Sequence, residues 1–148
     1  MTKHDNWLGG AAALSAVAAV VVATFAVAIG AQAAEDVFGV WQHPDNGSLI
    51  ETYPCGAGLC ARIKKIADGQ TTDHRNIDPE LRGRPIVGLV IVSQATREGP
   101  ESWSGQIYNR IDGRTYDGRL TLKDRNRLEL TGCTAVIICR TVSWRRVP

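Results

Sequence analysis

Residues 102–122 read SWSGQIYNRIDGRTYDGRLTL, and this stretch decides the fold. Two runs of alternating apolar and polar residues, 102–109 and 114–122, flank Asp112-Gly113. Alternation with period two is typical of strands with one buried face, and Asp-Gly between two such runs favours a β-hairpin. The residues predicted to face inward on this hairpin are Trp103, Gly105, Ile107, Tyr116, Gly118, Leu120 and Leu122.

The same pattern continues on both sides of this hairpin, and no long stretch after residue 34 has a helical period. Strands are predicted over 37–43, 48–53, 59–66, 86–92, 102–109, 114–122, 127–132 and 137–146. Short strands joined by hairpins predict an all-β fold, a small antiparallel up-and-down β-barrel of about eight strands, with a sandwich as the alternative. Tryptophans and glycines on the inward face either plug the barrel or leave a small ligand pocket, and both readings stay open.

The predicted strand 86–92, IVGLVIV, is apolar on both faces. One face can pack inside the barrel, but the other must be covered or form an exposed apolar patch. The connection 67–85 is the expected cover. A connection of that length without a regular pattern is often functional.

The first 33 residues have the layout of a secretory signal peptide. Lys3 precedes an apolar run over 11–29, and Ala31-Gln32-Ala33 supplies small residues for cleavage after Ala33. We therefore expect a signal peptide over 1–33 and an exported domain over 34–148. The alternative is an uncleaved segment that anchors the chain in the membrane. Either reading predicts a periplasmic or secreted protein.

The charge argues against nucleic acid as a partner. The net charge is only +2, and it stays +2 when Lys3 and Asp5 leave with the signal peptide. An electrostatic footprint for nucleic acid needs a much stronger basic surface.

Four cysteines lie in the exported part: Cys55, Cys60, Cys133 and Cys139. An even number in an oxidising compartment predicts two disulfides. Short spacing favours Cys55 with Cys60 and Cys133 with Cys139. In an up-and-down barrel these two pairs lie at opposite ends, beyond disulfide reach of each other. A four-thiolate zinc site is the alternative, although neither pair has the usual spacing.

Polar candidates gather in the connection 67–85 and beside the Asp112-Gly113 hairpin. Asp and Asn side chains there can bind a cation or a polar ligand, or they can shape turns. The candidate ligand-binding residues are Asp73, Asn76, Asp78, Arg84, Tyr108 and Tyr116. No metal site and no cofactor are predicted, because the acidic residues lack the ordered spacing of a calcium loop.

Several segments together resemble a known family. They are DVFGVW (36–41), DHRNIDP (73–79), LRGRPIVGL (81–89), GQIY (105–108), DGRTY (112–116) and RTVSWR (140–145). In this order they resemble the bacterial domain of unknown function 2147 family, whose members are small exported proteins with no activity established for the class.

The start Gly39-x-Trp41 and the late Arg145 also resemble lipocalin-like (calycin) barrels. In those barrels an arginine of the last strand packs over the tryptophan of the first. The resemblance implies barrel closure by Gly39, Trp41, Trp144 and Arg145. Because alternation places Trp144 rather than Arg145 on the inward face, Arg140 or Arg146 is the alternative packing arginine.

The sequence has no G-x-S-x-G, no H-E-x-x-H and no phosphate-binding glycine loop. We therefore expect a non-catalytic module that binds a small apolar or amphipathic ligand at the barrel mouth. One alternative is a structural or interaction protein of the cell envelope, whose protein partner contacts 86–92 and 67–85. Another is a metal-dependent hydrolase, since the sequence does not show which carboxylates lie close together.

Overall fold

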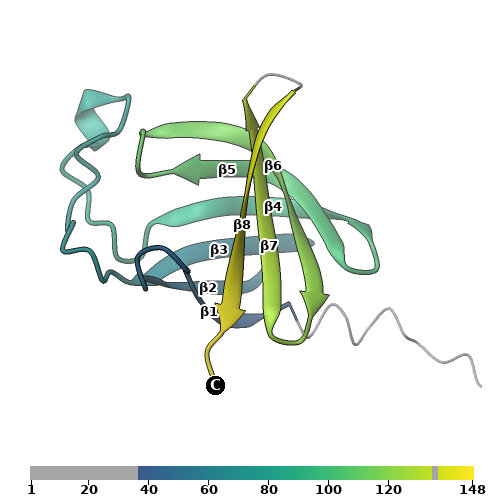
Figure 1. The fold of residues 1–148 in the computed structure, drawn as a ribbon. Helices are drawn as coiled ribbons and strands as arrows, with labels where there is room; N and C mark the ends of the chain where they lie inside the picture. Colours follow the sequence, from purple (N-terminus) through teal and green to yellow (C-terminus); the bar gives the residue numbers. More distant parts are fainter. Residues whose placement is uncertain (1–36, 135–136) are drawn as a thin grey trace, which may run out of the picture.

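The computed structural model describes residues 37–134 and 137–148, so the expected signal peptide lies outside the described residues. Eight antiparallel strands form a closed barrel in chain order, with β1 pairing both β2 and β8 (Figure 1). The strands are β1 (Gly39–Gln42), β2 (Leu49–Cys55), β3 (Gly58–Lys65), β4 (Val90–Gly99), β5 (Ser102–Asn109), β6 (Arg114–Asp124), β7 (Arg127–Thr134) and β8 (Ile138–Arg146). The prediction of an all-β up-and-down barrel is confirmed.

Helix is almost absent from the described residues. The one short 3₁₀ helix there, η1 (Pro79–Leu81), lies in the long connection between β3 and β4, at the left of the barrel in Figure 1. Within 37–134 and 137–148, no helix is both long and apolar enough to cross a membrane.

Seven of the predicted strands agree with observed ones to within two residues at each end, but the strand predicted over 86–92 is wrong. The observed β4 begins only at Val90. Residues 86–89 form a turn in which Leu89 N donates to Ile86 O at 3.0 Å and Gly88 has a φ of +88°. Residues 93–99, which lie outside the predicted strands, continue β4 because they pair with β5 through their backbone.

One end of the barrel is filled by side chains. The large side chains that are fully buried in this end of the barrel, or next to it, are Trp41, Leu120, Leu128 and Trp144. The Trp41 indole Nε1 donates to Thr52 Oγ1 at 2.9 Å and lies 3.3 Å from Val37 O, so its polar atom is satisfied inside the packed end. This end carries the turns β2–β3, β4–β5 and β6–β7 together with the C-terminus of β8.

Arg146, not Arg145, closes the barrel over the first strand. The guanidinium carbon of Arg146 lies 4.2 Å from the centroid of the Trp41 ring. Gly39 leaves it room, because a Cβ at that position would lie 2.7 Å from Arg146 Nη1. Arg145 is exposed instead. The correction follows from strand alternation, since residues 144 and 146 share the inner face and residue 145 points away.

The predicted disulfides Cys55–Cys60 and Cys133–Cys139 are both confirmed. The first joins β2 to β3 at the filled end, and the second joins β7 to β8 at the other end. Each bridges two neighbouring strands close to their turn. The two pairs therefore lie at opposite ends of the barrel, as the up-and-down topology requires.

The connection between β3 and β4 does not cover the outer face that we expected it to cover. Val87 and Val90 remain 55% and 41% exposed, whereas Ile86 and Val92 are fully buried. The connection lies against the β5–β6 hairpin instead, where Ile77 N donates to the carbonyl oxygen of Gly113. The expectation that 67–85 shields this strand is wrong, because its polar side chains find hydrogen-bond partners at the hairpin.

Candidate functional site

The second end of the barrel holds a cavity of about 490 Å³. Its walls are apolar side chains from six of the strands, with Trp144 as the innermost lining residue of β8. The wall residues are Ile50, Ile63, Ile91, Ile107, Leu130 and Val142. The sequence left open whether side chains fill the barrel or leave a ligand pocket. Both occur, in different halves: one half is filled, and the other encloses a pocket.

The mouth of the cavity is polar and charged. The mouth is framed by the β1–β2 turn, the β5–β6 hairpin, the C-terminal end of β7 and the start of β8. These elements contribute His43, Asp45, Asp112 and Arg140. Partial burial lowers the pKa of His43 below 6.5; Asp45 opposes this shift, whereas Arg110 and Arg140 add to it. An apolar interior with a charged rim is the usual chemistry of a site for an amphipathic molecule.

Arg110 is a buried cation at this mouth that the sequence analysis missed. It is 7% exposed, forms an ion pair with Asp68 and donates through Nη1 to Gln70 Oε1 at 3.0 Å. It also holds the pKa of Asp68 below its ordinary value through their hydrogen bond. No local signal marks Arg110, because its partners lie about forty residues earlier in the chain.

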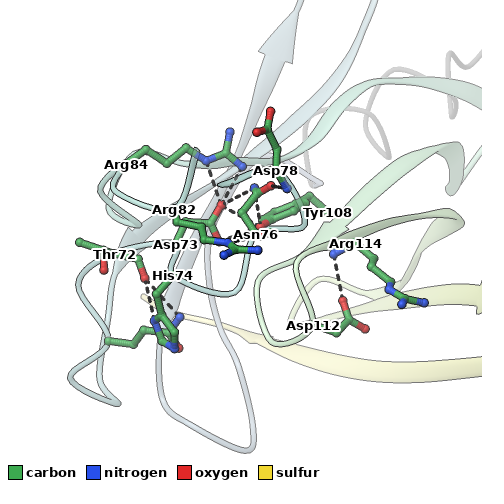
Figure 2. Close-up of polar contacts among 11 residues, drawn as sticks. Thr72, Asp73, His74, Asn76, Asp78, Arg82, Arg84, Tyr108, Asp112 and Arg114 are labelled. Carbon is green, nitrogen blue, oxygen red and sulfur yellow. Dashed lines mark hydrogen bonds and ion pairs between the residues drawn. The ribbon is translucent and has the colours of Figure 1, made fainter. Parts of the chain in front are cut away.

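Asp73 is the centre of a hydrogen-bonded cluster that braces the long connection (Figure 2). Its fully buried carboxylate accepts from Tyr108 Oη at 2.7 Å, from Asn76 Nδ2 at 2.8 Å and from Arg84 Nε at 2.9 Å. The Arg84 guanidinium also lies over the Tyr108 ring, 5.2 Å from its centroid. Burial of Tyr108, together with its hydrogen bond to Asp73, raises the pKa of the phenol above 10.0.

The tip of the β5–β6 hairpin holds the same connection at a second point. Arg75 Nη1 donates to Ile111 O at 2.9 Å. Gly113 has a φ of +71°, and a Cβ there would lie only 1.8 Å from the backbone oxygen of Arg75. The two backbones approach so closely that only glycine fits, which ties the connection to the rim of the cavity.

The structure places the six candidate ligand-binding residues in three different positions. Tyr108 and Tyr116 line the cavity. Asp73, Asn76 and Arg84 gather with Tyr108 in the bracing cluster and do not line it. Asp78 instead caps η1, where its side chain accepts from Glu80 N.

Tyr116 has an acidic partner at the mouth. Its hydroxyl donates to Asp112 Oδ2 at 2.5 Å, and this hydrogen bond raises the pKa of the phenol above 10.0. Across residues 37–134 and 137–148, no cluster of three or more His, Cys, Asp or Glu side chains is arranged to hold a metal ion.

Comparison with known proteins gives a family and a fold. The family model described as "Uncharacterized protein conserved in bacteria (DUF2147)" matches residues 39–146. Among solved structures, the chain is similar to protein HP1028 from the human pathogen Helicobacter pylori, which is described as belonging to the lipocalin family. The two are 27% identical with a TM-score of 0.66, over 74% of this chain and 82% of that one. No curated protein matches the sequence.

Proposed function

This chain belongs to the DUF2147 family of uncharacterised bacterial proteins, and from that premise we propose that it is a non-catalytic module that binds a small, partly apolar ligand inside its barrel. The observation that carries the proposal is the cavity of about 490 Å³, apolar within and charged at its mouth. Its size falls within the range of about 300–1,000 Å³ that is typical of small-molecule sites. The likeness to a lipocalin-family structure supports the same function.

The hydrophobic effect supplies the affinity in this proposal. Each methylene group that leaves water for the cavity contributes about 0.8 kcal/mol. A chain of about eight carbons thus gains about 6 kcal/mol before the entropy of association is subtracted. The charged mouth then orients the ligand, because a polar end is better solvated there than among the isoleucines.

We place this function in the periplasm or outside the cell. Both disulfides support an oxidising compartment, in agreement with the signal peptide expected over 1–33. In this proposal nucleic acid is not a partner, because a net charge of +2 provides little electrostatic attraction for it.

A cavity-filling variant tests the proposal. Gly132 lines the cavity, its φ is not positive, and an added Cβ would meet only Tyr116 Cβ at 3.8 Å. Gly132→Phe therefore projects a ring into the cavity without straining the backbone. Gly83→Phe is the matched control, because Gly83 is exposed, has no neighbour within 4 Å of such a Cβ and is not part of the lining.

The measurement is the fluorescence of the apolar probe N-phenyl-naphthylamine, which brightens when it leaves water. We expect the unmodified protein and Gly83→Phe to bind the probe with equal affinity, and Gly132→Phe to lose most of the binding. Equal binding by both variants, or no binding by the unmodified protein, contradicts the proposal.

A second candidate function, that of an interaction protein of the cell envelope, has one observation in its favour: the exposed Val87 and Val90. A photo-cross-linking amino acid at position 87 tests it in cells, with the exposed position 114 as the control site. A defined cross-linked product from position 87 alone supports this function, and identical patterns from both positions count against it.

A further inference from the structure

The cavity has a closed floor inside the barrel. Along the inner face of β8 the side chains become less exposed with depth: Arg140 is 84% exposed, Val142 is partly buried and Trp144 is 1% exposed. Trp144 is paired across the ladder with Leu128 of β7, which is fully buried and does not line the cavity. The next inward residue of β8 is Arg146, which belongs to the filled end. The cavity therefore ends at the level of Trp144 and Leu128.

The mouth limits the position of a ligand from the other side. The walls below it are the isoleucine, leucine and valine side chains named above. Ser48, Tyr108 and Tyr116 also line the cavity, but their hydroxyl groups are already hydrogen-bonded within the protein. A polar group drawn below the mouth would lose its hydration without gaining a partner, which is unfavourable. Only the apolar part of a ligand therefore enters.

The distance between mouth and floor follows from the strand geometry. Arg140 at the mouth and Trp144 at the floor are four positions apart on β8. Four residues extend about 13 Å along a strand, and a strand tilt of about 40° leaves about 10 Å along the barrel axis. In an extended carbon chain each bond of about 1.5 Å advances the chain by about 1.3 Å. The depth thus corresponds to about eight carbons.

We propose that this depth selects amphiphiles whose apolar part is about eight carbons long. A shorter chain leaves part of the apolar wall without a contact, and the extra carbons of a longer chain remain in water at the mouth. The acyl chains of membrane lipids are too long, because each leaflet of a bilayer has a hydrocarbon layer of about 15 Å. This inference rests on the proposed function and adds a length limit to it.

A series of straight-chain primary alcohols tests the limit, because they differ only in length and carry no charge. Displacement of N-phenyl-naphthylamine from the full exported protein gives the affinity of each alcohol from 1-butanol to 1-undecanol. We expect the affinity to rise about fourfold with each added carbon up to about 1-octanol, and to change little beyond it. A rise that continues at the same rate to 1-undecanol, or that stops at 1-pentanol, overturns the proposed depth.

A variant that fills the lowest part of the cavity adds a second test. Leu130 lines the cavity one inward position above Leu128 on β7. Leu130→Phe is expected to weaken the binding of 1-octanol about tenfold, the loss that corresponds to nearly two methylene groups, and to leave 1-butanol unchanged because its chain ends above the ring. Thr131→Phe is the matched control, since Thr131 bonds to Thr141 on the outer face and does not line the cavity.

The two variants have defined outcomes. We expect Thr131→Phe to bind every alcohol as the unmodified protein does. An equal loss for 1-butanol and 1-octanol in Leu130→Phe would show that the variant does not act through depth, and this overturns the inference. The series on the unmodified protein decides the question alone if Leu130→Phe folds poorly.

Failure of this inference is distinguishable from failure of the function beneath it. If the probe binds, but the alcohols do not displace it or displace it equally well at every length, the binding function stands and the length limit is overturned. If neither the probe nor any alcohol binds to the unmodified protein, the proposed function fails and takes the inference with it.

Discussion

The guanidinium of Arg146 lies over the indole ring of Trp41, 4.2 Å from its centroid, and Nη1 donates to Phe38 O at 3.0 Å. The same side chain donates through Nε to Arg125 O. This contact joins the last strand to the first at a seam where only two pairs of residues, Trp41 with Arg146 and Gln42 with Arg145, are in register. The barrel is therefore closed as much by one side chain as by the β1–β8 ladder.

Arg146→Met is predicted to destabilise the barrel by about 2 kcal/mol, because it removes a cation–π contact and hydrogen bonds to two carbonyl oxygens. Arg145→Met is the control on the exposed side of the same strand and is predicted to change stability by less than about 0.5 kcal/mol. Urea unfolding followed by tryptophan fluorescence measures both. Equal losses for the two variants would show that the closing contact is not specific to Arg146.

Gly113→Ala and Gly69→Ala separate backbone strain from steric conflict. Both glycines have positive φ, +71° and +78°, but a Cβ at Gly113 would collide with Arg75 O whereas one at Gly69 would meet nothing within 4 Å. Gly69→Ala is predicted to cost about 1 kcal/mol from strain alone. Gly113→Ala should cost clearly more and make the segment 67–85 susceptible to proteolysis, which limited trypsin digestion detects. Similar digestion of both variants would contradict the docking of this segment on the hairpin.

Asp73→Asn is predicted to loosen the same segment. The variant keeps the shape of the side chain but removes the charge that Arg84 pairs with and one acceptor for the Tyr108 phenol. We expect a loss of about 2 kcal/mol, because Arg84 is a third exposed and can regain water. Asp78→Asn is the matched control. Asp78 is the exposed N-cap of η1, and Asn caps a helix about as well as Asp does, so the stability should change little. Hydrogen exchange of residues 71–86 is the measurement, and equal exchange in the two variants argues against the cluster.

Acidification should weaken the protein partly through His43. Its folded-state pKa lies below 6.5 because of burial, so the unfolded chain takes up a proton first as the pH falls. The stabilisation is present above pH 6.5 and is lost as the pH falls through the lowered pKa. His43→Gln should flatten that loss. Asp45→Asn should deepen it, because Asp45 raises the pKa of His43. The measurement is the unfolding midpoint of the unmodified protein and the two variants as a function of pH, from above 6.5 to below the lowered pKa. If the three curves run parallel, the titration of His43 does not contribute to the acid sensitivity of the fold.

Alkaline pH should weaken the fold through two tyrosines. Tyr108 is shifted mainly by burial and Tyr116 mainly by its hydrogen bond to Asp112, and both pKa values lie above 10.0. The contribution of these two tyrosines to the stability of the fold is therefore fully present below pH 10.0. It is lost as the pH rises through their raised pKa values. Phenolate absorbance should show two late-titrating groups in the folded protein, and Tyr108→Phe and Tyr116→Phe should each remove one. The urea-unfolded chain is the reference, and identical titrations of the folded and unfolded protein would be the contrary result.

The alternation in 102–122 was sufficient to predict both ends of β5 correctly. A hairpin is a local structure, so one short stretch of sequence contains both its turn residues and the alternation of its strands. The disulfides were predictable for the same reason, since each pair bridges neighbouring strands close to their turn. The strand over 86–92 was misplaced because two-sided hydrophobicity does not distinguish a strand from a buried turn. Ile86 and Leu89 are both buried, but in a turn.

By itself the sequence determined seven of the eight strands, the hairpins, the cysteine pairs and hence the barrel, because period two and short spacing act between residues that are close along the chain. Tertiary structure alone decided which half of the barrel is filled, that Arg146 closes it, and that Asp68 and Asp73 meet Arg110 and Tyr108. Those partners are brought together only when the last strand returns to the first and the long connection reaches the hairpin. No local pattern records such distances, so the cavity became visible only in three dimensions.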